Sequence, residues 1–207
     1  MLMASVKRAL ERLTRRQPGP LPSFTRTQLM DLIMIIGRSE TIGRKRLSKL
    51  MGLGEGAVRT MLMRLKDDGL IEVVGREGCR LTQKGKRIYK ELEKTIKDLG
   101  ELKLELPWNY PSNYAVVVKN RAKLVRRGLE QRDEAIRAGA RAAIILTYRD
   151  DRLMMPGVTD LMEEHPSFAS NIIEAIKPEN GDVIIIVGAD DPLSARHGAL
   201  AAAETLL

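Results

Sequence analysis

The chain has 207 residues, and its 35 Lys and Arg residues against 27 Asp and Glu residues give a formal net charge of +8. A hydrophobic fraction of 43% supports globular cores and argues against global disorder. One cysteine excludes an intramolecular disulfide, and two histidines argue against a multi-histidine metal centre. No apolar run approaches the roughly 18 residues of a membrane span, and residues 1–16 lack the apolar core of a secretory signal. We therefore expect a cytoplasmic protein with no metal and no cofactor.

The positive charge is concentrated in the first half of the chain. Residues 1–100 contain 22 Lys and Arg against 11 Asp and Glu, a net charge of +11, whereas residues 101–207 contain 13 against 16, a net charge of −3. Near the divide, Pro107 and Pro111 stand four residues apart and are incompatible with a helix. We predict two domains, 1–100 and 101–207, of which the first is a basic module suited to a polyanion.

Two helices are predicted at the start of the first domain. One covers residues 3–15 and ends at the proline-rich segment 18–22; its inward residues are Val6, Leu10 and Leu13. The next begins with the capping box Thr25-Arg-Thr-Gln28 and has Gly37 at its C′ position. The inward residues of this second helix are Leu29, Leu32, Ile33 and Ile36.

A glycine turn then joins two further helices. Residues 44–51 are predicted to be a short helix with Leu47 and Leu50 inward, and Gly52-Leu-Gly54 supplies the tight turn. Residues 55–68 form the next helix, which ends at Gly69. Its inward residues are Val58, Leu62 and Leu65.

A hairpin and a long helix complete the first domain. Residues 70–74 and 79–82 are strand-like and flank the turn 75–78. The last helix runs from about residue 82 to residue 99. It carries an apolar seam that either forms a dimer contact or packs inside the protein, and the seam consists of Tyr89, Leu92, Ile96 and Leu99.

One continuous string carries a family resemblance: Arg44-Lys-Arg-Leu-Ser-Lys-Leu-Met-Gly-Leu-Gly-Glu-Gly-Ala-Val-Arg-Thr-Met-Leu-Met-Arg-Leu-Lys-Asp-Asp-Gly-Leu-Ile71. Together with the later Leu81-Thr-Gln-Lys-Gly85, it resembles bacterial and archaeal winged helix-turn-helix transcription regulators, over about residues 26–98. The resemblance implies a DNA-binding domain whose third helix enters the major groove.

Charge and helical period select the candidate DNA contacts on such a fold. Arg59 is the best candidate for a bidentate guanine contact, which discriminates between bases by about 1–3 kcal/mol, and Thr60 suits a thymine methyl group or a phosphate. The alternatives are a merely solvated basic face and a winged helix that binds protein or RNA. The full predicted set is Arg44, Lys45, Arg46, Glu55, Arg59, Thr60, Met63, Arg64, Arg76 and Arg80.

The second domain is predicted to be a small mixed α/β domain, so that the whole chain is α+β. Its predicted strands are 102–106, 114–119, 142–148, 152–155 and 182–188, and its predicted helices are 124–139, 158–164, 168–176 and 193–206. The run Val183-Ile-Ile-Ile-Val187 indicates a strand that is covered on both faces. In the helix 124–139 the residues expected on one side are Leu129, Ala135, Ile136 and Ala140.

No enzyme is expected, because the sequence contains no nucleotide-binding glycine loop, no nucleophile elbow and no metal-ligand cluster. A second hypothesis is a ligand pocket at the end of the buried strand, where α/β sheets bind ligands beside helix N-termini. The competing interpretations are a plain N-cap at Asp191, a solvated surface, and packing of Trp108 between the domains. The candidate ligand residues are Trp108, Arg132, Asp133, Asp190 and Asp191.

The whole chain also resembles a small archaeal family with an N-terminal winged helix and an uncharacterised C-terminal α/β domain. The segments that carry this resemblance are Arg132-Asp-Glu-Ala-Ile-Arg-Ala-Gly-Ala140, Met155-Pro-Gly157 and Glu179-Asn-Gly-Asp182. The resemblance implies a transcription regulator and fixes no ligand. We therefore predict a homodimeric regulator that binds double-stranded DNA, with a second domain that senses a small-molecule effector or mediates assembly. The alternative is an adaptor whose winged helix binds protein or RNA.

Overall fold

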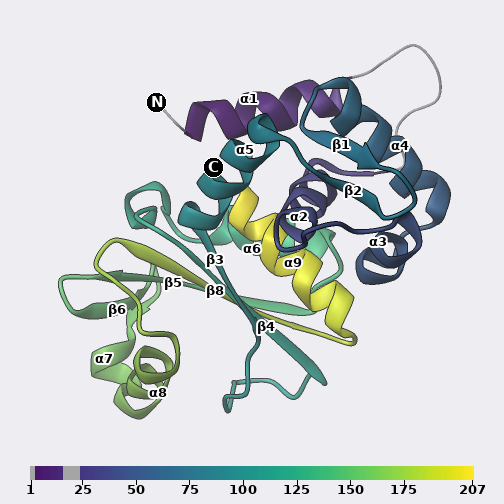
Figure 1. Cartoon of the computed structure of the whole chain (residues 1–207). Coiled ribbons are helices and arrows are strands. Elements are labelled where there is room, and N and C mark those ends of the chain that lie inside the picture. The colour runs from purple at the N-terminus through teal and green to yellow at the C-terminus, as the bar shows by residue number, and fades with distance from the viewer. Residues whose placement is uncertain (1–2, 16–23) are drawn as a thin grey trace. The chain divides into compact units, whose positions relative to one another are not determined.

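A computed structural model of the chain describes residues 3–15 and 24–207 (Figure 1). The chain divides into two compact units, Met1–Glu93 and Lys94–Leu207. The division falls near the end of a helix, a few residues before the boundary expected from the charge and the prolines. Each unit has its own core, and the two are described separately below.

The first unit is a winged helix-turn-helix preceded by an additional helix, as predicted. The buried helix α2 contacts α1, α3 and the second strand of a two-stranded hairpin, the wing. The elements are α1 (Met3–Thr14), α2 (Arg26–Gly37), α3 (Arg44–Met51), α4 (Glu55–Asp67), β1 (Ile71–Val74), β2 (Gly78–Leu81) and α5 (Gln83–Thr95). The predicted end of the first helix at residues 18–22 lies outside the described residues.

Local sequence accounts for the start of α2 but not for its end. The predicted capping box is present: the Thr25 hydroxyl accepts from the Gln28 backbone N–H at 3.1 Å, and the Gln28 side chain accepts from the Thr25 N–H at 2.9 Å. The prediction that Gly37 is the C′ residue is wrong, because the helix extends through Gly37 to a cap at Arg38. Gly37 has another function: a Cβ there would lie 2.2 Å from the Tyr89 ring of α5. The glycine therefore lets α5 pack closely against α2.

The helix-turn-helix has the predicted turn but a different set of inward residues. Gly52 ends α3 in the left-handed conformation with φ 62°, which glycine adopts without strain. Leu50, predicted to be inward, is 40% exposed, and Met51 is buried in its place. In α4, Leu62 is only half-buried, whereas Met61 is fully buried beside Val58 and Leu65. The remaining predicted inward residues, Leu47, Val58 and Leu65, are buried, so a single inward residue differs in each helix.

The wing is attached to the helices by an extra strand contact. Strands β1 and β2 pair antiparallel, with Val74 opposite Gly78, so the predicted hairpin is confirmed. Ile42 and Cys79 exchange two backbone hydrogen bonds of 3.0 Å. A Cβ on Gly78 would lie 2.2 Å from the Ile42 carbonyl oxygen, so this close approach requires glycine. The turn of the wing is thereby fixed to the segment that precedes α3.

The predicted helix 82–99 is too long, and its apolar seam is not continuous. Helix α5 ends at Thr95, and the next residues form strand β3 (Ile96–Glu101), which pairs antiparallel with β4 (Ser112–Val118). The backbone of residues 96–101 forms hydrogen bonds with β4, a strand that follows later in the chain, and so cannot continue the helix. Tyr89 and Leu92 therefore lie on a helix, while the other two seam residues, Ile96 and Leu99, lie on a strand.

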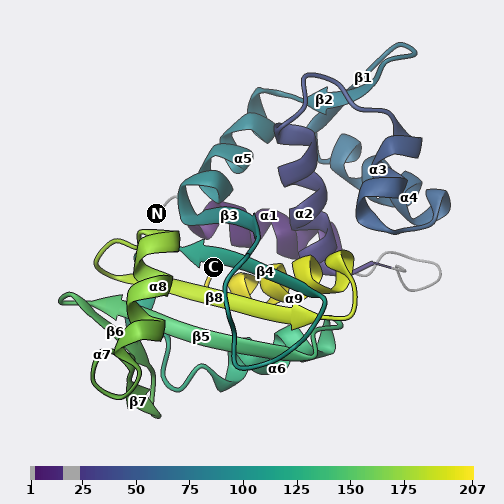
Figure 2. The ribbon, with the colours of Figure 1, turned by 90° about the horizontal axis from the view of Figure 1, so that it is seen from below.

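The second unit is built on a six-stranded antiparallel sheet in the order β3-β4-β8-β5-β6-β7. Figure 2 shows the central strands β4, β8 and β5 side by side. The remaining elements are η1 (Ala122–Leu124), α6 (Leu129–Arg137), β5 (Ala142–Arg149), β6 (Arg152–Met155), β7 (Thr159–Asp160), α7 (Leu161–Glu164), α8 (Pro166–Ile176), β8 (Asp182–Ala189) and α9 (Pro192–Glu204).

Both faces of this sheet are covered. Helices α6 and α9 pack on one face, and α7 and α8 contribute to the hydrophobic core on the other. Every residue of β8 is buried, which confirms that this central strand is covered on both faces. The alternating side chains Ile184 and Ile186 point into the core beneath α8.

Three predicted elements of the second unit are wrong in whole or in part. The helix predicted over 158–164 is only the short helix α7, because Thr159 and Asp160 form strand β7 and pair with β6. Residues 102–106 are not a strand: Leu102, Leu104 and Leu106 pack half-buried against the core while β3 takes the edge of the sheet. The helix predicted over 124–139 begins only at Leu129, because Gly128 adopts φ 72°. A Cβ on Gly128 would lie 2.9 Å from the Ile145 side chain.

The inward face of α6 also differs from the prediction. Leu129 and Ile136, expected inward, are exposed, and the buried helical residues are Gln131 and Ala135.

Candidate nucleic-acid interface

The outer face of α4 carries the side chains that the helical period assigned to DNA. Val58, Met61 and Leu65 are buried against the rest of the unit, so the opposite face is turned outward. On that face Glu55 and Arg59 are exposed, Met63 is 54% exposed and Thr60 is half-buried. The Thr60 hydroxyl donates to the Gly56 carbonyl oxygen at 3.1 Å and is therefore already satisfied within the helix.

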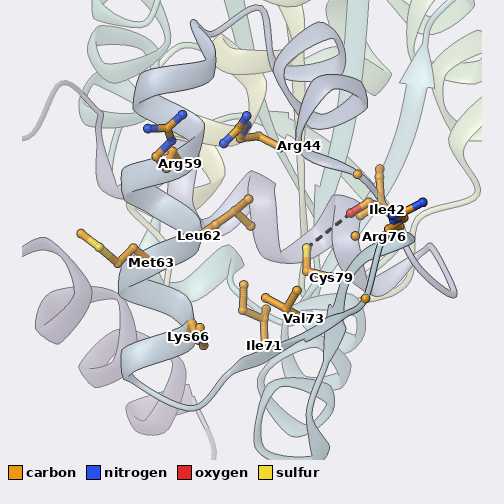
Figure 3. A pocket seen from close by; sticks show the side chains of 13 residues that line it. Ile42, Arg44, Arg59, Leu62, Met63, Lys66, Ile71, Val73, Arg76 and Cys79 are labelled. Atoms are coloured by element: carbon orange, nitrogen blue, oxygen red, sulfur yellow. Dashed lines mark hydrogen bonds between the residues drawn. The ribbon is translucent and has the colours of Figure 1, made fainter.

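A groove of about 470 Å³ lies between α4 and the wing (Figure 3). Its polar side chains are all cationic, and no carboxylate lines it. Leu62 points from α4 toward the wing strands, whereas Met63 points away from them. The lining residues are Ile42, Gly43, Arg44, Arg59, Leu62, Met63, Lys66, Ile71, Val73, Gly75, Arg76, Gly78 and Cys79.

Two of the predicted cations are engaged in ion pairs on the surface. Arg44 contacts Glu55 at 3.2 Å, and Arg80 contacts Glu72 at 2.7 Å. All four side chains are at least 40% exposed, and exposed pairs of this kind contribute about 0–1 kcal/mol, so a phosphate can replace the carboxylate at small cost. Arg59 and Arg76 form no ion pair within the described part of the chain. Like Lys45 and Arg46, these two cations are exposed and available to a polyanion.

The start of α3 is a second place suited to phosphate. The helix begins after Gly43, which provides no side-chain cap, and Arg44, Lys45 and Arg46 are exposed in its first turn. Uncapped N–H groups at a helix N-terminus carry partial positive charge and favour anions. The three cationic side chains and the helix terminus therefore all favour the binding of a phosphate group.

Arg64 does not belong to this surface, contrary to the prediction that it reaches DNA. Its side chain is 8% exposed and donates to the carbonyl oxygens of Leu13 at 2.6 Å and Arg15 at 3.2 Å. Its guanidinium also lies 5.2 Å from the centre of the Phe24 ring. The additional helix α1 supplies these acceptors, so Arg64 anchors α1 to α4.

A carboxylate at the end of α4 makes a second anchor for α1. Asp68 accepts two hydrogen bonds from Arg12, of 2.5 and 2.7 Å, and contacts the Lys84 ammonium group at 3.2 Å. The bond from Arg12, followed by that from Lys84, holds the pKa of Asp68 below its ordinary value, against the opposing effect of burial. The cluster joins α1, α4 and α5 and so stabilises the support beneath the groove.

Cys79 lies in the floor of the groove, where its role is structural. The side chain is buried, and its thiol lies 3.5 Å from the Ile42 carbonyl oxygen. Burial raises the pKa of this thiol to about 11, so the reactive thiolate is a negligible fraction at neutral pH.

The predicted ligand residues of the second unit are not brought together. Trp108 donates to Asn113 at 2.7 Å, and Arg132 pairs with its neighbour Asp133 at 3.0 Å. Asp190 pairs with Arg141 at 2.7 Å. Asp191 is the N-cap of α9, accepting from the Leu193 and Ser194 N–H groups, which agrees with the structural alternative. The strand-end argument fails because it applies to parallel sheets, whereas this sheet is antiparallel.

A pocket of about 510 Å³ lies elsewhere in the second unit, on the α7–α8 side of the sheet. Its wall is mostly apolar, with Glu105, His165, Ser167 and Asn171 as polar members. The sequence offered little sign of it, because the wall combines residues of strands β5 and β6, helices α7 and α8 and an irregular segment. The lining residues are Glu105, Leu106, Pro107, Ile144, Met155, Leu161, His165, Ser167, Phe168 and Asn171.

Metal-binding clusters and membrane-spanning helices are both absent from the residues that the structure describes. Residues 3–15 and 24–207 contain no group of three or more His, Cys, Asp or Glu side chains arranged to hold a metal ion. In the same residues no helix is long and apolar enough to cross a membrane.

Comparison with known proteins finds a match for each part of the chain. Residues 26–96 match the family model of the CggR N-terminal DNA binding domain, and residues 111–206 match a domain of unknown function, DUF4443. Among solved structures, the hypothetical protein PH0730 from Pyrococcus horikoshii OT3 is 33% identical. That alignment covers 89% of this chain and 93% of the other, with a TM-score of 0.69. No curated protein matches the chain.

Proposed function

The chain belongs to the same family as the hypothetical protein PH0730 from Pyrococcus horikoshii OT3, and because its residues 26–96 match a DNA-binding domain model we propose that it is a DNA-binding transcription regulator. In this proposal the first unit binds double-stranded DNA, the protein acts as a homodimer, and the second unit senses a small molecule or mediates assembly. No catalytic activity is assigned to either unit.

The observation that carries the proposal is the cationic groove beside the outer face of α4. Arg44, Arg59, Lys66 and Arg76 line it without a carboxylate, in a segment that matches a DNA-binding domain model. In winged helix-turn-helix proteins the helix in the position of α4 enters the major groove. Arg59 would then face base edges, while Arg76 at the tip of the wing would contact the phosphate backbone.

The pocket of the second unit supports the proposed sensor function, and we propose this pocket, rather than the residues predicted from the sequence, as the effector site. A largely apolar pocket with a few polar groups is the usual form of a small-molecule site. A ligand there changes DNA binding only if it favours one of two arrangements of the protein. The measurement is the melting temperature of the protein with a panel of metabolites. A panel without any shift removes the sensor function and leaves assembly as the role of this unit.

Selection of bound duplexes from a random pool tests the DNA-binding function directly. We expect enrichment of a palindromic sequence, because a twofold homodimer presents two α4 helices to two half-sites. Affinity for the enriched duplex should fall steeply with salt. Enrichment of a site without a repeat would refute the dimer but retain DNA binding. Failure to enrich any duplex would refute the function itself and favour the adaptor that binds protein or RNA.

A further inference from the structure

One exposed side chain on the outer face of α4, Met63, is uncharged and cannot contribute to DNA binding through charge. Met63 is 54% exposed, and the cations Arg59 and Lys66 lie four residues before it and three residues after it on the same face. Both Met63 and Leu62 line the groove, but Figure 3 shows Met63 directed away from the wing and Leu62 directed toward it. A large apolar side chain therefore stands at the centre of the surface that would face the bases.

The major groove of DNA has one apolar feature on its floor, the C5-methyl group of thymine. All its other recognition groups are hydrogen-bond donors and acceptors, to which a thioether side chain offers little. Arg59 and Lys66 flank the methionine on the same face of α4, and their charge would attract the DNA to this face in the proposed complex. Burial of one methyl group against a flexible, polarisable methionine is favourable by the hydrophobic effect.

We propose that Met63 reads the thymine methyl group, so that the binding site contains an A·T pair facing the middle of α4. This inference rests on the proposed DNA-binding function and adds a specificity determinant to it. Thr60, the residue expected from the sequence to contact a thymine methyl, has its hydroxyl bonded to Gly56 and is half-buried. Met63 is the more exposed apolar group of the two.

The test uses the full chain and a duplex enriched from a random pool. Each thymine is replaced in turn by deoxyuridine, which removes only the methyl group. In the wild-type protein one thymine per half-site should be sensitive, with affinity reduced about fourfold, the value expected for one buried carbon group. Met63→Ala should bind the unmodified duplex more weakly than the wild-type protein does. Replacing the sensitive thymine by deoxyuridine should not lower the affinity of this variant further. The matched control is Met162→Ala, an exposed methionine of the second unit, which should retain the wild-type sensitivity.

The outcomes separate this inference from the function on which it rests. If the wild-type protein enriches no duplex, the DNA-binding function fails. If it binds an enriched duplex but tolerates every deoxyuridine within twofold, the role of Met63 is refuted and DNA binding stands. If one thymine is sensitive in both the wild-type protein and Met63→Ala, another residue contacts the methyl group. Circular dichroism and the melting temperature establish that Met63→Ala is folded, as expected for an exposed side chain.

Discussion

Arg59 and Arg76 occupy different parts of the groove, and removing each side chain should change DNA binding in a different way. Arg59 lies on the outer face of α4, and Arg76 lies in the turn of the wing. Arg59→Ala should reduce the preference for the cognate over a random duplex by about 1–3 kcal/mol, because a bidentate base contact is lost. Arg76→Ala should lower the affinity for both duplexes equally, because phosphate contacts carry no sequence information.

The measurement for this pair is the dissociation constant for each duplex at a fixed salt concentration. Lys49→Ala, an exposed cation at the end of α3 outside the groove, is the matched control and should have little effect. A uniform loss with both groove variants would contradict base reading by Arg59.

The Asp68 cluster makes the free energy of unfolding of the first unit depend on pH in the acidic range. The pKa of Asp68 in the folded protein is lowered from its ordinary value of 3.8, chiefly by the hydrogen bond from Arg12. The contribution is complete at a pH above that ordinary value and is lost as the pH falls through the lower, folded-state pKa. Asp68→Asn should therefore cost about 1–3 kcal/mol at pH 7 and much less at pH 2.

Urea denaturation at the two pH values measures this difference. Asp67→Asn is the control, because the neighbouring carboxylate is exposed and forms no ion pair within the described ranges. An equal cost of Asp68→Asn at both pH values would show that the loss comes from packing rather than from the ion pairs.

Arg64 shows where sequence reasoning about the site reaches its limit. The helical period placed four of the five contacts predicted within α4 on its outer face, because burial of Val58 and Leu65 determines the opposite face. Arg64 lies toward the side of the helix, and its burial depends on acceptors from α1 some fifty residues earlier in the chain. No local pattern contains that partner. A charged residue at the border of an apolar stripe can be assigned only when the neighbouring helix is known.

At the scale of elements, the wing depends on one glycine. Gly78 has φ 121° and faces the Ile42 carbonyl oxygen, so Gly78→Ala introduces both backbone strain and a clash. We expect a loss of stability of at least about 2 kcal/mol. Gly75→Ala is the matched comparison, since a Cβ at Gly75 meets nothing within 4 Å and the change should be milder. The two variants are compared by urea denaturation, and equal losses would contradict a special role for the Ile42 contact.

Elements defined by local signals were predicted better than those defined by distant partners. The capping box at Thr25 and the hairpin turn at 75–78 are both local, and both are present. The end of α5 at Thr95 is set by pairing with β4, and the start of α6 is set by packing of Gly128 on Ile145. Hydrophobic spacing also cannot separate a strand from an irregular segment that packs one side on the core, which is why residues 102–106 were misassigned.

At the scale of the whole molecule, the division into units sharpens the meaning of the net charge. Residues 1–93 contain 20 Lys and Arg against 10 Asp and Glu, a net charge of +10, whereas residues 94–207 contain 15 against 17, a net charge of −2. A regulator that binds DNA through the first unit alone should therefore owe its salt dependence to that unit. Removing cations of the second unit should not change the salt dependence of DNA affinity.

This division predicts the effect of single charge removals on the slope of log affinity against log salt concentration. Arg76→Ala and Lys45→Ala, both exposed in the first unit, should each reduce the steepness of the slope by about 0.9, the value for one lost phosphate contact. Lys123→Ala and Arg126→Ala remove equally exposed cations from the second unit and should leave the slope unchanged. The measurement is a titration of duplex binding between about 50 and 200 mM salt, the range over which phosphate contacts dominate affinity. A reduced slope with either second-unit variant would extend the DNA-binding surface to that unit, and the acidic net charge would then be a poor guide to where the nucleic acid lies.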